Sequence, residues 1–159
     1  MPETRPTYPH VLHRRTWYGV TASVEISSKW IHRAGFGKLL VPHPGLANWL
    51  LRRGMNPKVA ATQCIRHEFW HLQTVPFAAV YTGILLAVSI GAETMSWLKL
   101  LVLAVSAQAV WEFMSEFFTR FSDIETYRAG YKGIRKLPRI VFWLTSVVAA
   151  GIGTFIFVY

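Results

Sequence analysis

The chain has 159 residues, of which 52% are hydrophobic, and its single cysteine, Cys64, excludes an intrachain disulfide. It carries 17 Lys and Arg against 8 Asp and Glu, for a net charge of +9. Long uncharged runs beside basic segments favour an integral membrane protein whose partner is the lipid bilayer, and they argue against a partner that is a nucleic acid.

The first 55 residues are predicted to form a cytoplasmic and interfacial N-terminal arm. Residues 1–26 contain three prolines and no sustained period, which is typical of irregular structure. Residues 28–40 and 45–53 mix Trp, Leu and Ile with Lys or Arg, as amphipathic segments on a membrane surface do.

A helix is predicted to begin at Asn56-Pro57, because Asn is a favoured N-cap and Pro suits the first helical position. This helix opens the second predicted domain, a three-helix transmembrane domain over 56–159. It would continue without interruption through residues 67–71, which fit the pattern HExxH.

The HExxH pattern predicts a zinc site. Residues four apart on a helix lie one turn above each other, so His67 and His71 can bind the same ion through their imidazoles. Glu68 lies beside that face, where it could take a proton from a zinc-activated water and pass it to a leaving amine. We therefore expect Zn²⁺ as cofactor and Glu68 as the catalytic residue.

Three transmembrane helices are predicted, so the expected fold class is all-α. The first covers 72–92, where 21 uncharged residues at 1.5 Å each span a hydrocarbon core of roughly 30 Å, and Pro76 marks a kink at the lipid boundary. The others cover 95–111 and 140–159. The distribution of Lys and Arg predicts a cytoplasmic N-terminus and an outside C-terminus. A bacterial inner membrane is taken as the default location.

A catalytic zinc site usually has three protein ligands, so a third must come from elsewhere. If the chain reverses near Glu93, positions equally far from this turn lie at similar depth, which places Glu112 and Glu116 level with the histidines. Such a pair of acids at the membrane boundary needs a compensating cation, either zinc or one of Arg66 and Arg120. The alternative is that both are interfacial acids paired with arginines.

Other potential ligands are weaker candidates. Glu125 is interpreted as a solvated loop acid, and Cys64 as a packing residue, because a single helix rarely supplies three ligands to a tetrahedral ion. The remaining histidines lack metal-ligand spacing and are interpreted as solvated or interfacial groups: His10, His13, His32 and His43.

Residues 67–71 resemble the HExxH helix of zincin metallopeptidases, and 111–116 resembles the later ExxxD helix of integral-membrane members of the gluzincin branch. The resemblance implies that both histidines and Glu112 bind zinc. It also implies that Glu116 supports a histidine and that Glu68 is the general base. Glu116 stands where the family has aspartate, so its longer side chain is also a ligand candidate. No edge strand for an extended peptide, and no oxyanion-stabilising Tyr or His, can be assigned from the sequence.

The preferred hypothesis is a membrane-embedded zinc hydrolase, a peptidase acting on a protein segment at the cytoplasmic membrane face. The alternative is a non-catalytic small subunit of a larger membrane complex, with a structural metal or none. Three helices bury little surface, and Ala149 and Gly153 form a small-residue pair suited to packing against membrane-protein partners. Ligation of haem or chlorophyll by His67 or His71 is a third reading, which two histidines one turn apart disfavour.

Overall fold

A computed structural model describes residues 11–26, 32–43, 50–52, 54–91, 96–132 and 137–158, without the side chains of 43, 137–142 and 157. The chain divides into two compact units. The first contains Met1–Gln73 and Phe117–Arg135, and the second contains Thr74–Glu116 and Lys136–Tyr159.

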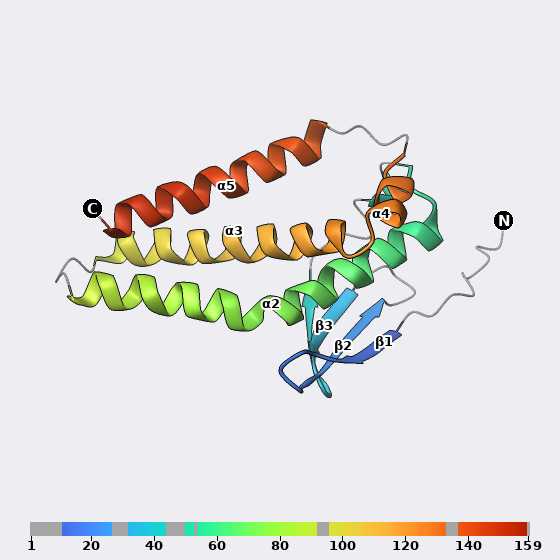
Figure 1. The fold of residues 1–159 in the computed structure, drawn as a ribbon, viewed down its shortest axis with the longest axis horizontal. Helices are drawn as coiled ribbons and strands as arrows, with labels where there is room; N and C mark the ends of the chain where they lie inside the picture. The colour runs from blue at the N-terminus through green and yellow to red at the C-terminus, as the bar shows by residue number, and fades with distance from the viewer. Residues whose placement is uncertain are drawn as a thin grey trace. The chain divides into compact units, whose positions relative to one another are not determined.

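The first unit contains a four-stranded antiparallel sheet (Figure 1). Its strands, in spatial order, are β1 (Val11–Arg15), β2 (Thr21–Ile26), β3 (His32–Phe36) and β4 (Leu39–His43). The predictions of an all-α fold and of irregular structure up to 26 are therefore wrong in the described residues. The predicted amphipathic segment 28–40 contains β3 and the start of β4, and its position at a membrane surface stays a prediction. The segment 45–53 lies mostly outside the described residues. Strands this short show only a weak alternation of polar and apolar residues in the sequence. Whether such a segment forms a strand depends on its pairing with other segments.

Glycines allow the hairpin of β3 and β4 to form. Gly37 has a φ of +59° in the two-residue turn between the strands, a conformation that L side chains rarely adopt. At Gly35 the two backbones approach so closely that a Cβ would lie 1.8 Å from the carbonyl oxygen of Leu39. A larger residue at Gly35 would therefore force the strands apart.

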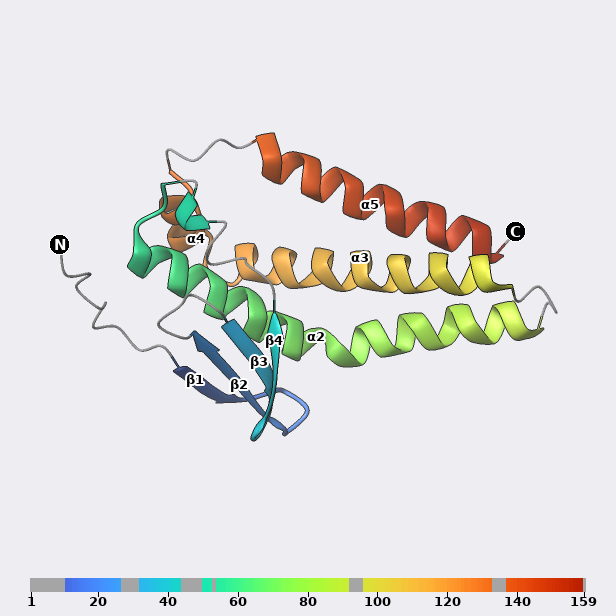
Figure 2. The same cartoon turned by 180° about the vertical axis from the view of Figure 1, so that it is seen from behind.

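One face of the sheet packs on the N-terminal half of α2 (Pro57–Gly91), as Figures 1 and 2 show. Ala22, Val24 and Ala34 of the sheet form a buried cluster with Phe69 and Leu72 of the helix. The two alanines are small, so the sheet approaches closely the helix segment that carries the HExxH residues.

The N-terminus of α2 confirms the predicted helix start. The side chain of Asn56 accepts a hydrogen bond from the backbone N–H of Lys58 at 3.0 Å, and its carbonyl accepts one from Ala60 at 2.8 Å. The helix then runs unbroken through 67–71. His67, Glu68 and His71 are thus on one continuous helix, as the sequence predicted.

Pro76 lies inside α2 without ending it. Because proline has no N–H, the carbonyl four residues earlier, that of Leu72, loses its helical hydrogen bond. The hydroxyl of Tyr18, in the turn between β1 and β2, donates to this carbonyl. Burial raises the pKa of Tyr18 above its usual value. Trp17 adds a bond of 2.8 Å from its indole N–H to the carbonyl of Gln73. The sheet therefore completes the hydrogen bonding of α2 where the proline interrupts it.

Replacing Tyr18 with Phe should destabilise the protein by about 1–3 kcal/mol, because the buried Leu72 carbonyl loses its donor. In a Pro76→Ala background the helix regains a backbone N–H, so Tyr18→Phe should cost clearly less there. Unfolding in detergent micelles, followed by circular dichroism, measures both costs. Equal costs in the two backgrounds would show that the hydroxyl does not replace the missing N–H.

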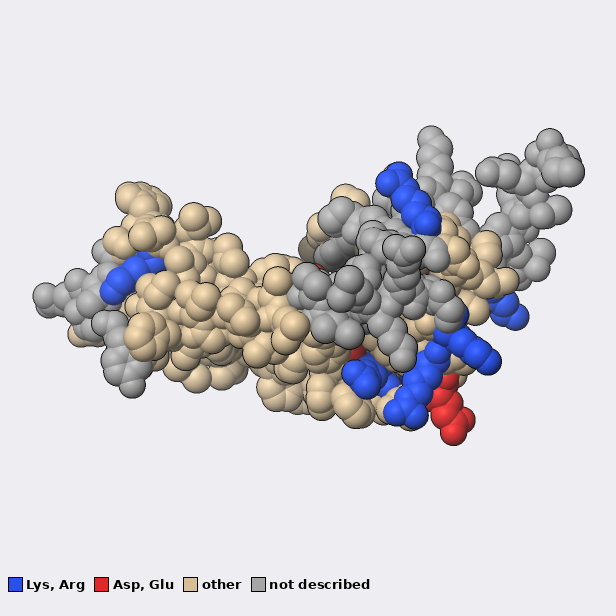
Figure 3. Space-filling view, turned by 90° about the horizontal axis from the view of Figure 1, so that it is seen from above, with Lys and Arg blue, Asp and Glu red and all other residues tan. Residues whose placement is uncertain are grey.

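The second unit consists of the C-terminal half of α2, most of α3 (Trp97–Phe121) and α5 (Leu137–Val158). By length and composition, α2 and α3 are two helices that are able to cross a membrane. For the third predicted span, the described apolar stretch is Trp143–Ile156, so that span stays a prediction. The charged side chains described in this unit are Lys99, Glu112 and Glu116, and Figure 3 shows a broad surface without charged groups.

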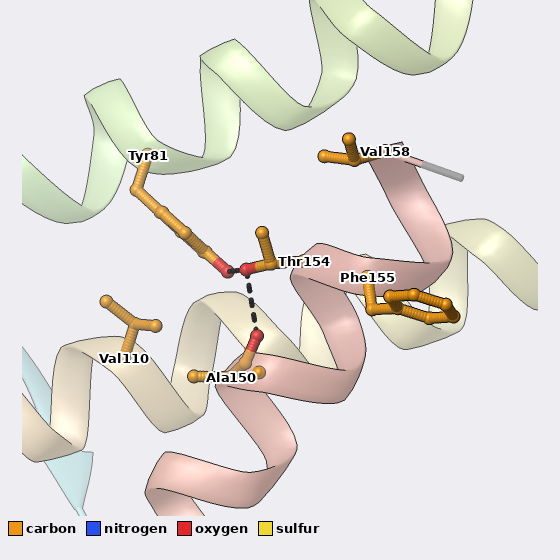
Figure 4. Close-up of a pocket in the computed structure, with 7 residues that line it drawn as sticks. Tyr81, Val110, Ala150, Thr154, Phe155 and Val158 are labelled. Atoms are coloured by element: carbon orange, nitrogen blue, oxygen red, sulfur yellow. Dashed lines mark hydrogen bonds between the residues drawn. The ribbon is translucent and has the colours of Figure 1, made fainter.

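A polar contact links the three helices of the second unit. The hydroxyl of Tyr81 on α2 lies 2.8 Å from Oγ of Ser106 on α3. The same hydroxyl lies 2.9 Å from Oγ1 of Thr154 on α5, the contact that Figure 4 shows. Nearby, a Cβ at Gly153 would lie 2.3 Å from Cβ of Ser106. Gly153 of the predicted small-residue pair thus allows a close contact between α5 and α3 inside this chain.

Gly153→Ala should push α5 away from α3 and lower the free energy of unfolding by about 1–3 kcal/mol, as overpacking in a dense interior does. The matched control is Gly151→Ala on the same helix, where an added Cβ meets nothing within 4 Å. Since Ala favours helix over Gly, this control should be neutral or stabilising by up to about 1 kcal/mol. Thermal unfolding in micelles compares the two, and a similar loss in both would refute the close contact.

Candidate metal centre

The imidazole rings of the two HExxH histidines lie close together on α2. Nε2 of His67 and Nε2 of His71 lie 3.0 Å apart, and the side chains are buried, with residue exposures of 7% and 5%. A tetrahedral zinc ion with Zn–N bonds of about 2.0–2.1 Å separates two nitrogen ligands by about 3.3 Å. The two rings therefore need only a small displacement to bind one ion.

Glu68 faces the sheet and meets a histidine that the sequence analysis had assigned to solvent or the interface. Its Oε1 lies 2.9 Å from Nε2 of His32 on β3, and the two residues are 3% and 0% exposed. On β3, His32 and Ala34 are buried, and the charged Arg33 between them is exposed. The sequence signal for this arrangement is the alternation of a charged residue with less polar ones. The pairing of β3 with β2 determines that the buried side chains of β3 face α2.

A third side chain joins this pair. Cys64 precedes Glu68 by one helical turn, and one ligand atom from each of His32, Cys64 and Glu68 lies within 4.8 Å of the others. All three are buried. Cys64 also packs against Ile26 and Ala61, as expected for a packing residue. The first unit thus holds a His–Cys–Glu group that has the ligand types of a zinc site.

The predicted acids are on α3, in the second unit. Glu112 is half-buried and accepts a hydrogen bond of 2.9 Å from Nε2 of Gln108. Glu116 is buried, and Ser115 between the acids donates to the carbonyl of Trp111. One helix carries both acids, but their roles as third ligand and supporting acid stay predictions.

Arg66, which the sequence offered as a partner for those acids, pairs with Asp123 at 3.1 Å. Asp123 caps α4 (Ile124–Gly130) by accepting from the N–H of Thr126. The hydrogen bonds from Thr126, and then the Arg66 guanidinium, hold the pKa of Asp123 below its usual value. Glu125 is exposed in the first turn of α4 and belongs to no group of three potential ligands within the described ranges. It therefore has no structural support as a ligand.

Comparison with protein-family models, with curated proteins and with solved structures found no match. The resemblance to zincins thus rests on the residues of α2 and α3 quoted above. What the structure adds to it is the continuous helix that carries HExxH and the burial of His67, Glu68 and His71.

The pairing of His32 with Glu68 can be measured in metal-free protein. His32→Ala should destabilise it by about 3–5 kcal/mol, because a buried carboxylate is left without that imidazole. His13→Ala is the control, since this exposed histidine on β1 makes one hydrogen bond of 2.8 Å, to Ser23, and its loss should cost about 1 kcal/mol.

A double-mutant cycle with Glu68→Ala, measured by unfolding in micelles, should give a coupling energy of at least about 1 kcal/mol between His32 and Glu68. If the destabilisation of the double variant equals the sum of those of the two single variants, the two side chains do not interact in the folded protein.

Proposed function

We propose that this chain is a membrane-embedded, zinc-dependent hydrolase that cleaves peptide bonds at the cytoplasmic membrane face. The observation that carries the proposal is the pair of buried imidazoles, His67 and His71, with Nε2 atoms 3.0 Å apart on one helix. At this distance the two rings are hydrogen-bonded to each other, and both present Nε2 to the same point. A zinc ion shared by both rings fits this arrangement.

The ligands in this proposal are His67, His71 and Glu112, with Glu116 either supporting a histidine or taking the place of Glu112. A bound zinc ion would polarise the scissile carbonyl and lower the pKa of water to about 7. Glu68 accepts the proton of the attacking water and passes it to the leaving amine, as a general base and then a general acid.

His32 would orient this base. Its Nε2, 2.9 Å from Oε1 of Glu68, would restrain the direction of the carboxylate. Both groups are shielded from solvent, which strengthens the interaction between them.

Peptides are the favoured substrate class because the sheet has edges that the sequence did not reveal. In the described part of the chain, β1 pairs only with β2, and β4 only with β3. An extended peptide can add to such an edge through main-chain hydrogen bonds. A substrate strand would then be held beside the helix that carries Glu68.

The membrane location is supported by α2 and α3, which are long and apolar enough to cross a bilayer. The excess of Lys and Arg before α2 and after α3 favours a cytoplasmic N-terminus. We extend this to three spans, an outside C-terminus and a bacterial inner membrane.

One observation favours the alternative of a non-catalytic subunit with a structural metal. The group of His32, Cys64 and Glu68 contains a buried thiol, and thiolate ligands are typical of structural zinc sites. If zinc bound there, Glu68 would be a ligand and would not be free to act as a base.

Zinc content separates the two functions. Purified protein in micelles should contain one zinc per chain, and Glu68→Gln should keep it while hydrolysis of a fluorogenic peptide mixture falls by about 10²–10⁴-fold. His71→Ala should lose the zinc, because one of its two imidazole ligands is gone. Mass spectrometry of the metal measures the content of each variant.

Cys64→Ala is the matched control, since it should leave zinc and hydrolysis unchanged. Loss of zinc from Cys64→Ala, with retention in His71→Ala, would place the ion on the thiol-containing group and support the structural alternative. Absence of zinc from the parent protein would refute both.

A further inference from the structure

Both turns of the sheet lie at the same end of it. Arg15 pairs with Thr21 across the first turn, and Phe36 pairs with Leu39 across the second. Ala22 next to the first turn pairs with Phe36 next to the second, so β2 and β3 bring the turns together. Figure 2 shows this end of the sheet, which we call the turn end and define as Trp17, Val20, Lys38 and Leu39.

The turn end is unusually apolar for an exposed surface. Trp17 is 64% exposed, Val20 43% and Leu39 75%. Lys38 beside Leu39 and Arg15 before the first turn are exposed as well. Exposed apolar side chains grouped with basic ones indicate a surface that meets an apolar partner with anionic groups around it.

The turn end is hydrogen-bonded to α2 at the start of the uncharged run of this helix. Trp17 donates from its backbone N–H to Oε1 of Gln73 at 3.1 Å and from its indole to the Gln73 carbonyl at 2.8 Å, and Tyr18 donates to the Leu72 carbonyl. In the sequence, Leu72 is the first of 21 uncharged residues. The turn end therefore lies at the level where α2 would enter a bilayer.

We infer that the turn end inserts into the headgroup region of the membrane that α2 crosses. Trp places its apolar ring and polar N–H at the level of the headgroups, as the exposed Trp17 can. Leu39 and Val20 would reach the boundary of the acyl chains, while Lys38 and Arg15 bind anionic lipid headgroups. The sheet is then a membrane-docked layer and not a solvated domain.

The inference also bears on the proposed function, although it does not depend on zinc. His71 directly precedes Leu72, so a docked turn end places the two histidines just outside the apolar layer. A substrate segment leaving the membrane would reach the sheet edge and the histidines at the same depth.

The insertion can be tested with a fluorescent probe on a cysteine at position 39. Leu39→Cys, labelled with an environment-sensitive dye and reconstituted into phosphatidylcholine–phosphatidylglycerol vesicles, should show a blue-shifted emission and loss of fluorescence when spin-labelled lipids are added. Val11→Cys is the matched control, because Val11 is 44% exposed at the opposite end of β1. Its emission should stay unshifted and should be quenched by aqueous iodide.

The parent protein is the labelling blank, since its one cysteine, Cys64, is fully buried. A position-39 probe that iodide quenches as well as the position-11 probe would overturn the inference. A probe protected from both iodide and spin-labelled lipid would also overturn it, by showing that protein covers the turn end. Chelation of zinc should not change either signal, so a failed zinc assay leaves this result standing.

Discussion

The candidate centre depends on the close packing of one sheet face against α2. A period of 3.6 residues per turn places Cys64, His67, Glu68 and His71 on one side of that helix. The alanines of β2 and β3 allow the sheet to approach, and the site side chains become buried. Buried polar groups need partners. The pair of imidazoles and the pair of His32 with Glu68 both follow from this requirement.

The helical part of the fold could be predicted because its signals are local. Asn56-Pro57 marks the start of α2, and an uncharged run long enough to cross a bilayer marks its apolar part. A shorter apolar run, interrupted by Lys99, marks that of α3. The sheet could not be predicted from local signals, because each strand has five or six residues and is stable only when paired with its neighbours. A turn such as Gly37-Lys38 indicates a hairpin only once both flanking segments are recognised as strands.

The candidate site also has a part that local sequence signals predict and a part that they do not. The placement of His67, Glu68 and His71 on one helix could be predicted, because the spacing within one helix is a local property. His32 was missed because its contact with Glu68 spans 36 positions and depends on the register of β2 with β3. The acids proposed as the third ligand lie on another helix, and no spacing along the chain determines how two helices pack. Glu112 and Glu116 therefore remain assigned by sequence depth and by resemblance.

The hydrogen bond from Tyr18 to Leu72 also constrains how the protein is made. Residues 11–43 leave the ribosome before α2 does, and a meander of adjacent strands has mostly short-range contacts that form early. The sheet can thus be folded when the Leu72 carbonyl, which its own helix cannot satisfy because of Pro76, appears. If the sheet folds first, the Leu72 carbonyl meets its donor as soon as this turn of α2 forms.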